Sequence, residues 1–259
     1  MSDNRPIALF DSGVGGLSIL SEIKKVLPKE SVIYFADQKN NPYSNKRPRE
    51  IKKFSKKIAE FLVKQDAKLI VAACNTVSCY AIEDLRKRFK LPIVGTVPAI
   101  KPAAQKTKNG KIAVLATSST AKSKYLKDLV KKHAQSAQVL VMSSQKLVED
   151  IEIGDIKAAA NTLKKYLSKV DHFAADTLVL GCTHFPFLKG SMSKPKRKIR
   201  IIDSGEAVAK QVKNILIKED LLSGKKRQDM YFTSGDSILF SKVASYLLEY
   251  KVEAQKETL

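Results

Sequence analysis

The sequence predicts an α/β protein in which parallel sheets are flanked by helices and in which one α/β unit occurs twice. Short apolar segments alternate with amphipathic segments along the chain, which is typical of successive strand–helix units. Two apolar segments, 69–74 and 177–182, each end on a cysteine that small polar residues follow. Such continuous runs are typical of strands buried on both faces. Because open α/β sheets bind ligands at the carboxyl ends of strands, we expect Cys74 and Cys182 on either side of one substrate.

Length and composition indicate a globular protein. The chain has 259 residues, of which 44% are hydrophobic, enough for one large or two moderate domains. No apolar run approaches the roughly 18 residues of a membrane-spanning helix. Asp3 and Arg5 near the N-terminus do not fit a signal peptide, so we expect a cytoplasmic protein with no membrane partner. Three cysteines do not form the pattern of a disulfide framework, and we expect free thiols.

The formal net charge of +21 raises the alternative of a nucleic-acid-binding protein. Lysine supplies most of this charge and is spread over nearly every expected helix, and no basic run alternates with aromatic residues. We therefore expect a lysine-rich solvated surface and no specific nucleic-acid partner. The basic segment 194–198 is expected to be a surface loop.

The chain opens with a strand at 6–10, a glycine-rich turn at 11–16 and a helix from Leu17. The turn matches neither the dinucleotide fingerprint nor the Walker A spacing. Its glycines either serve tight strand–helix packing or expose amide groups that favour an anion at the start of the helix. Asp11, at the end of the strand, is a candidate to orient or deprotonate a neighbouring group.

A second strand is expected at 31–36, followed by a loop with Pro42 and Tyr43 and a helix over 51–62. The first cysteine strand precedes a helix over 75–89. We expect Asn75 or Thr76 to be its N-cap and Cys79, inside it, to be a small buried residue. A short strand at 91–96 follows, and Pro98 with Pro102 indicates a crossing between domains.

A second unit begins with a strand at 111–116, a polar turn at 117–120 and a helix. Alignment of Ile7 with Ile112 gives an offset of 105 residues, and alignment of Cys74 with Cys182 gives 108. Similar offsets for two strand–turn–helix pairs indicate a duplicated α/β unit. The remaining apolar segments predict strands at 139–142, 199–203 and 228–233, and helices at 155–167 and from about residues 208 and 238.

Three kinds of chemistry suit these thiols. Cys74, Cys79, Cys182 and His184 could bind zinc, but their spacing contains no C-x-x-C pair. Cys182 and His184, two residues apart at a strand end, could be the nucleophile and base of a hydrolase or transferase, which leaves Cys74 without a role.

The third is proton transfer at a carbon atom from two opposite faces, as in a racemase. One thiolate would remove the Cα proton while a thiol returns one on the other side. Hydrogen-bond donors at Ser12, Asn75, Thr76 and Thr183 could hold the charge that develops on a substrate carboxylate. Asp11, Glu152 and His184 could set the protonation states of the thiols. No pattern marks a pyridoxal phosphate site, so we expect no cofactor and no metal.

Several segments together resemble the cofactor-independent glutamate racemases of the aspartate/glutamate racemase superfamily. They occur in the expected order from Phe10 to Asp236, and they are residues 10–16, Pro42-Tyr43, 73–76, 181–186, 203–205 and 232–236. The resemblance implies two pseudo-symmetric α/β domains, each with a mainly parallel sheet flanked by helices, and an active site in the cleft between them. The first domain would hold residues 1–96 plus 208–259, and the second residues 97–207.

The resemblance also implies the interconversion of L- and D-glutamate, supplying D-glutamate for peptidoglycan, with glutamate as the small-molecule partner. Cys74 would take the proton from D-glutamate and Cys182 from L-glutamate. Asp11 would assist Cys74, and His184 with Glu152 would assist Cys182. Residues matching the family's substrate contacts are Asp11, Ser12, Pro42, Tyr43, Ser44, Asn75, Thr76, Thr117, Thr120, Thr183 and His184. A homodimer is left open.

Two positions depart from the family pattern. Ser44 stands where the family usually has glycine after Pro-Tyr, and Ala36 replaces a usual glycine in the preceding strand. A positive φ at position 44 would strain a serine, whereas its hydroxyl could add a hydrogen bond. Because the sequence does not reveal the length of the substrate side chain, aspartate is the alternative substrate.

Overall fold

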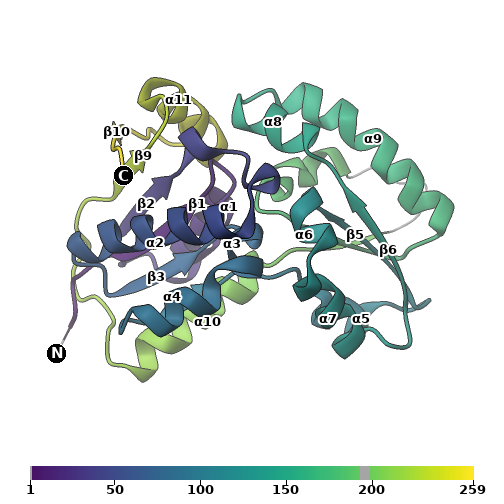
Figure 1. The fold of residues 1–259 in the computed structure, drawn as a ribbon, viewed down its shortest axis with the longest axis horizontal. Helices are drawn as coiled ribbons and strands as arrows, with labels where there is room; N and C mark the ends of the chain where they lie inside the picture. Colours follow the sequence, from purple (N-terminus) through teal and green to yellow (C-terminus); the bar gives the residue numbers. More distant parts are fainter. Residues whose placement is uncertain (1, 193–198) are drawn as a thin grey trace.

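The computed structural model describes residues 2–192 and 199–259, so the expected basic loop at 194–198 lies outside the described residues. The chain forms two lobes, each a parallel sheet covered by helices (Figure 1). The predicted fold class is therefore confirmed. The termini both lie in the lobe that contains the first sheet.

The first sheet has six parallel strands in the order β10-β9-β2-β1-β3-β4. Every residue of the three strands at its centre is buried, which explains their unbroken apolar sequences. The edge strand β10 was not predicted, because Ala-Gln-Lys carries no apolar pattern. The strands are β1 (Ile7–Asp11), β2 (Val32–Ala36), β3 (Leu69–Ala72), β4 (Ile93–Gly95), β9 (Met230–Thr233) and β10 (Ala254–Lys256).

The second sheet repeats the order of the first. Its strands β5 (Lys111–Ala116), β6 (Gln138–Ser143), β7 (Thr177–Gly181) and β8 (Arg200–Ile202) lie in the order β6-β5-β7-β8, which corresponds to β2-β1-β3-β4. The register is also repeated. Ile7 pairs with Leu69 and Ile112 pairs with Thr177, positions related by the same offsets of 105 and 108 residues. The duplicated unit is thus confirmed, and it places Cys74 and Cys182 at equivalent strand ends.

Helices cover both sheets. Helix α10 follows the last strand of the second sheet and packs against α1 of the first lobe. The helices are α1 (Leu17–Val26), α2 (Pro48–Lys64), α3 (Asn75–Tyr80), α4 (Ile82–Arg88), α5 (Ile100–Lys106), α6 (Ser118–Lys122), α7 (Lys124–His133), α8 (Lys146–Glu152), α9 (Ile156–Phe173), α10 (Gly205–Lys218) and α11 (Ser237–Leu248). Short 3-10 turns occupy Gln38–Asn40, Tyr43–Asn45 and Phe185–Met192.

The single helix predicted over 75–89 was wrong. The chain forms α3 and α4, separated at Ala81, and the N-cap of α3 is Cys74 rather than Asn75 or Thr76. Both predicted caps are already helical; the Asn75 side chain bonds to the Thr96 carbonyl and that of Thr76 to Thr117. The predicted polar turn after β5 is instead the start of α6, with Thr117 as the N-cap whose side chain accepts from the Thr120 N–H.

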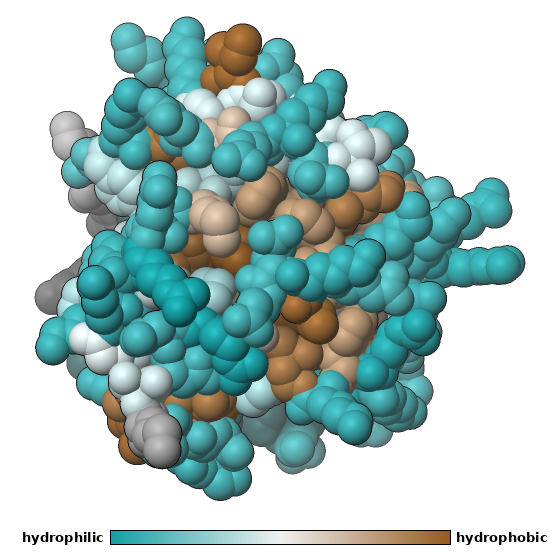
Figure 2. Space-filling model, turned by 90° about the vertical axis from the view of Figure 1, so that its left-hand side faces the viewer, coloured by the Kyte–Doolittle hydropathy of each residue, from teal (hydrophilic) through white to brown (hydrophobic). Residues whose placement is uncertain are grey.

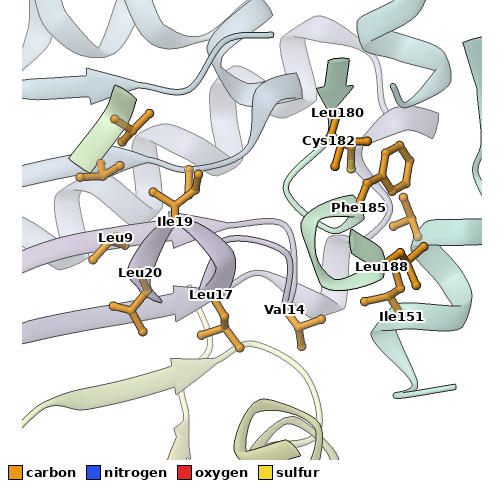
Figure 3. Close-up of a cluster of buried hydrophobic side chains, with 14 of the residues drawn as sticks. Leu9, Val14, Leu17, Ile19, Leu20, Ile151, Leu180, Cys182, Phe185 and Leu188 are labelled. Carbon is orange, nitrogen blue, oxygen red and sulfur yellow. The ribbon is translucent and has the colours of Figure 1, made fainter. Parts of the chain in front are cut away.

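A continuous hydrophobic cluster joins the two lobes (Figure 3). Val14 and Leu17 contribute from the first lobe, and Ile151 and Phe185 contribute from the second. All four side chains are fully buried. The cluster therefore holds the carboxyl ends of the two sheets toward one another.

The surface is mainly hydrophilic, with apolar side chains gathered near the centre of one face (Figure 2). The exposed apolar side chains include Ile238 and Tyr246 of α11, with exposed fractions of 82% and 62%, and Ile153 after α8, with 62%. Over the described ranges, no helix has the length and apolar character needed to cross a bilayer.

Candidate active site

A pocket lies between the two lobes, where the carboxyl ends of the central strands of both sheets meet. Both predicted thiols line it. Of the other predicted residues, its walls include Ser12, Pro42, Tyr43, Ser44, Asn75, Thr76, Thr117, Thr183 and His184. Two residues that sequence reasoning missed, Asn41 and Val148, complete the lining. No sequence feature marked Val148 as a pocket residue, because a valine in an apolar segment usually belongs to the core.

On one side of the pocket, Cys182 belongs to a buried three-residue chain. Its Sγ lies 3.5 Å from His184 Nδ1, and His184 Nε2 lies 2.5 Å from Glu152 Oε1. Burial alone would lower the pKa of His184, but the charges of Cys182 and Glu152 and their hydrogen bonds raise it well above its usual value. The raised pKa favours the protonated ring, which can donate a hydrogen bond to the Cys182 sulfur.

The Glu152 carboxylate completes this chain from helix α8. Burial alone would raise the pKa of Glu152, but hydrogen bonds from His184 and Gln38 and the charge of His184 lower it. Oε1 accepts the Val14 N–H at 2.8 Å, and Oε2 accepts the Gln38 side-chain amide at 3.0 Å. Both donors come from the first lobe, so the carboxylate of the second lobe is held across the cleft.

The glycine-rich turn provides the space for this acid–base pair. A Cβ atom at Gly13 would lie 1.8 Å from Glu152 Oε1, and one at Gly15 would lie 2.4 Å from His184 Nδ1. The glycines thus do more than permit strand–helix packing within their own lobe. They allow the side chains of the opposite lobe to approach the backbone of the turn.

On the other side of the pocket, Cys74 is linked to a carboxylate through a serine. The Cys74 S–H donates to Ser12 Oγ at 4.0 Å, and the Ser12 hydroxyl donates to Asp11 Oδ1 at 3.3 Å. Asp11 also accepts from the Gly13 N–H at 3.1 Å and from the Thr183 hydroxyl at 3.0 Å. Burial, with a further contribution from the charge of Asp11, raises the pKa of Cys74 far above its usual value. The raised pKa favours the neutral thiol form of Cys74.

Hydroxyl and amide groups line the pocket or lie just behind its wall. Thr76 Oγ1 lies 3.1 Å from Thr117 Oγ1 and 3.2 Å from Thr120 Oγ1. The Asn75 side-chain amide donates to the Thr96 carbonyl at 3.4 Å, and its buried Oδ1 has no partner among the residues that the structure describes. These groups can hydrogen-bond to a small polar molecule that enters the pocket.

Three predicted site residues do not line the pocket. Asp11 lies behind Ser12 and Thr183, Glu152 behind His184, and Thr120 behind Thr76. Their side chains can act only through those neighbours.

The loop before α2 closes the pocket from the first lobe. The Tyr43 hydroxyl donates to Asp37 Oδ2 at 2.6 Å. The Ser44 hydroxyl reaches across the cleft and bonds Oε1 of Gln145, the N-cap of α8. Ser44 lies in a 3-10 turn and is not among the residues with positive φ, so the serine is accommodated without backbone strain.

Cys79 lies outside the pocket, where the Ser123 hydroxyl donates to its sulfur at 3.6 Å. Burial raises its pKa. The four ligands considered for zinc are thus not brought together. Across 2–192 and 199–259, no group of three or more His, Cys, Asp or Glu side chains is arranged to hold a metal ion.

Comparison with known proteins agrees with this geometry. The family model Asp/Glu/Hydantoin racemase matches residues 16–212. A glutamate racemase from Herpetosiphon aurantiacus is 38% identical over 249 residues, covering 94% of this chain and 98% of its own length. One from Clostridium novyi is 43% identical over 238 residues, covering 90% of this chain and 92% of its own length.

Solved structures show the same fold. A glutamate racemase isoform from Bacillus anthracis superposes with a TM-score of 0.89 at 29% identity, covering 99% of this chain and 98% of its own. An Escherichia coli glutamate racemase, crystallised with L-glutamate and an activator, superposes with a TM-score of 0.87 at 33% identity, covering 98% of both chains. The chain belongs to the Asp/Glu/hydantoin racemase family and is an amino-acid racemase, an isomerase.

Proposed function

We propose that this racemase interconverts L- and D-glutamate by proton transfer between two cysteines on opposite sides of Cα. The observation that carries the proposal is the pair of buried sulfur atoms at equivalent strand ends, both lining one pocket. Each sulfur has its own link to a carboxylate, through His184 on one side and through Ser12 on the other.

The resemblance to glutamate racemases gives the direction of each transfer in this proposal. The Cys182 thiolate, beside the His184 cation, removes the Cα proton of L-glutamate. The neutral Cys74 thiol then delivers a proton to the opposite face, which yields D-glutamate. In the reverse direction the Cys74 thiolate is the base and the Cys182 thiol is the acid.

A Cα proton beside a carboxylate is a very weak acid, so the pocket must stabilise the charge that develops on that carboxylate. The proposal gives this role to Asn75, Thr76 and Thr183, and it is supported by their presence in the pocket lining with both cysteines. Pro42, Tyr43 and Ser44 line the part of the pocket that α8 covers, where the substrate side chain would lie. Glutamate is favoured because the similar enzymes are glutamate racemases. Aspartate is the alternative substrate.

The Cys182, His184 and Glu152 chain also has the order of a nucleophile, a base and an orienting acid. This arrangement supports a Cys–His hydrolase on one side of the pocket. It gives no role to Cys74, and the relatives reported above are racemases. The two-thiol mechanism explains both sulfur atoms and is therefore preferred. The comparisons give no support to the nucleic-acid alternative.

The biological setting follows from this chemistry. We propose that the product D-glutamate is used in peptidoglycan synthesis. Because both pocket thiols must stay reduced, a reducing compartment, the cytoplasm, suits the enzyme.

We propose that residues 1–96 plus 208–259 form the first domain and residues 97–207 the second. The sheets support this division, because β5 to β8 pair only with one another and the other strands form the first sheet. Helix α10 (Gly205–Lys218) packs against α1, which supports a return of the chain to the first domain within the first turn of this helix. A homodimer is supported by the exposed apolar side chains of α11, and light scattering of the purified protein tests it.

Proton exchange followed by NMR in D₂O tests the proposed reaction. Purified protein without added cofactor is mixed with L-glutamate and, separately, with L-aspartate. We expect deuterium at Cα of glutamate with loss of optical rotation, and collapse of racemisation in Cys74→Ser and Cys182→Ser. Cys79→Ser is the matched control and should remain active. Deuterium incorporation into aspartate alone would show that aspartate is the substrate. No incorporation into either amino acid by the folded protein would contradict the proposal.

A further inference from the structure

The closing motif at residues 232–236, which resembles the racemase family, has no role in the mechanism above. Its Thr233 lies at the end of β9, beside β2 in the first sheet. The Thr233 hydroxyl donates to Gln38 Oε1 at 2.9 Å and so holds the carbonyl end of the Gln38 amide. The Gln38 NH₂ group then donates to Glu152 Oε2 at 3.0 Å.

The surrounding residues keep the Gln38 side chain in this path. A Cβ atom at Gly235 would lie 2.8 Å from Gln38 Cβ, so the glycine leaves room for the glutamine. Gln38 also opens the 3-10 turn that follows Asp37. The Ser234 hydroxyl donates to Asp37 Oδ1 at 2.7 Å and anchors the start of that turn.

An unbroken chain of contacts thus leads from Thr233 through Gln38, Glu152 and His184 to the sulfur of Cys182. The first two residues belong to the first lobe and the last three to the second. Glu152 has only two oxygen atoms to offer, and His184 and Val14 already occupy Oε1. Gln38 therefore supplies the contact at the second oxygen and fixes the rotation of the carboxylate about its last torsion.

We propose that Gln38, held by Thr233, is a positioning residue for the Cys182 half of the reaction. It fixes Glu152, and through Glu152 the His184 ring, in the orientation that serves the Cys182 sulfur. Gln38 does not line the pocket, so it acts without touching the substrate. This inference rests on the proposed two-thiol racemisation.

The equilibrium between enantiomers limits what simple kinetics can reveal. L- and D-glutamate have equal free energies in water, so any variant must lose the same factor in kcat/KM in both directions. The deuterium isotope effects in the two directions, in contrast, can change independently of one another. When proton transfer to Cys182 becomes slower, the step that breaks the Cα–H bond of L-glutamate limits the rate more strongly. The corresponding step for D-glutamate then limits it less.

The experiment compares Gln38→Ala and Thr233→Val with Thr233→Ser, which keeps the hydroxyl, and with Gln138→Ala, an exposed glutamine at the start of β6. We expect kcat/KM to fall about tenfold in Gln38→Ala, the usual effect of losing a hydrogen bond to a charged group. The primary deuterium isotope effect on kcat/KM should rise for L-[2-²H]glutamate and fall for D-[2-²H]glutamate. Thr233→Val should follow the same trend, whereas Thr233→Ser and Gln138→Ala should match the wild type.

The pH profile is a second measure. The Gln38 amide helps to lower the pKa of Glu152 against the effect of burial, so its loss should move the acid limb of kcat/KM to higher pH. Gln38→Glu places another carboxylate beside Oε2 and should move this limb further.

Each outcome separates the inference from the proposed function. Absence of racemisation by the wild type would overturn the proposed function itself. An active wild type together with a Gln38→Ala variant that matches Gln138→Ala would overturn the inference alone. A loss of activity with equal changes in the two isotope effects would also overturn it, because a general disturbance of the pocket does not favour one sulfur.

Discussion

At the residue scale, the site depends on the missing side chains of Gly13 and Gly15 as well as on the side chains that line the pocket. Sequence reasoning found both sulfur atoms because each follows a recognisable strand end, whereas the specific roles of Asp11, His184 and Glu152 came from the family resemblance. It could not choose between packing and anion binding for the glycine turn. The choice depends on Glu152, which lies 139 positions after Gly13 and approaches only when the two lobes meet.

Gly13→Ala tests this role of the turn. The added methyl group would overlap the Glu152 carboxylate and displace it from His184. We expect kcat/KM to fall by about 10²-fold, the usual cost of misplacing a catalytic group by roughly 1 Å. Gly190→Ala is the control, since a Cβ atom there would meet nothing within 4 Å. Equal activity of the two variants would show that the carboxylate does not need this space.

Glu152→Gln tests the electrostatic link to Cys182. Despite burial, the Glu152 carboxylate helps to raise the pKa of His184, so its removal should let the ring lose its proton at lower pH. We expect the alkaline limb of kcat/KM to move to lower pH and the maximum to fall about tenfold. Exposed Glu149 on the same helix provides the control Glu149→Gln. An alkaline limb that stays at the wild-type position would contradict the link.

At the scale of secondary structure, the apolar patterns located the central strands to within one or two residues. They failed where side chains make tertiary contacts instead of capping the helix. Asn75 and Thr76 look like helix caps, yet their polar groups turn to Thr96 and Thr117. Ser78 likewise accepts the Thr96 N–H at 2.8 Å. These contacts are long-range, so local sequence rules could not predict them.

A buried ion pair ties several elements together at the end of the first sheet opposite the pocket. Lys68 Nζ, just before β3, lies 2.6 Å from Glu30 Oε2, and both side chains are almost fully buried. The same ammonium group donates to the carbonyls of Asp3 and Leu221 and to the Ser223 hydroxyl, at 2.6 to 3.0 Å. Lys68 therefore fastens the N-terminal segment and the loop after α10 to the sheet.

We expect Lys68→Ala to reduce the free energy of unfolding by about 3–5 kcal/mol, because it leaves Glu30 buried without its counter-charge. Urea denaturation followed by circular dichroism measures this loss. Lys64→Ala, which removes an exposed lysine of α2, should change stability by less than about 0.5 kcal/mol. Equal effects of the two substitutions would refute the role of the pair.

At the scale of the whole molecule, the similar offsets of 105 and 108 residues predicted the duplication, and the two sheets repeat both order and register. The packing of the two lobes could not be predicted from the sequence. The hydrophobic cluster that joins them contains side chains such as Val14 and Ile151, which lie far apart in the chain and share no local sequence pattern.

The net charge of +21 belongs to this scale as well. We expect the protein to retain a DNA oligomer at about 20 mM salt through nonspecific attraction and to release it by about 150 mM. A gel-shift series across these salt concentrations measures this. Sequence-dependent binding that persists at the higher concentration would revive a nucleic-acid role.

The repeated register has a further consequence. A protein made of L-amino acids cannot present mirror-image surroundings to the two enantiomers of its substrate. In the proposed mechanism, two equivalent strand ends line one pocket, and each would offer a sulfur to one face of the same carbon. The repeated backbone would then treat both hands of the substrate nearly alike. Any preference between them would come from the side chains that differ between the copies, such as His184 and Glu152 beside one sulfur and Ser12 and Asp11 beside the other.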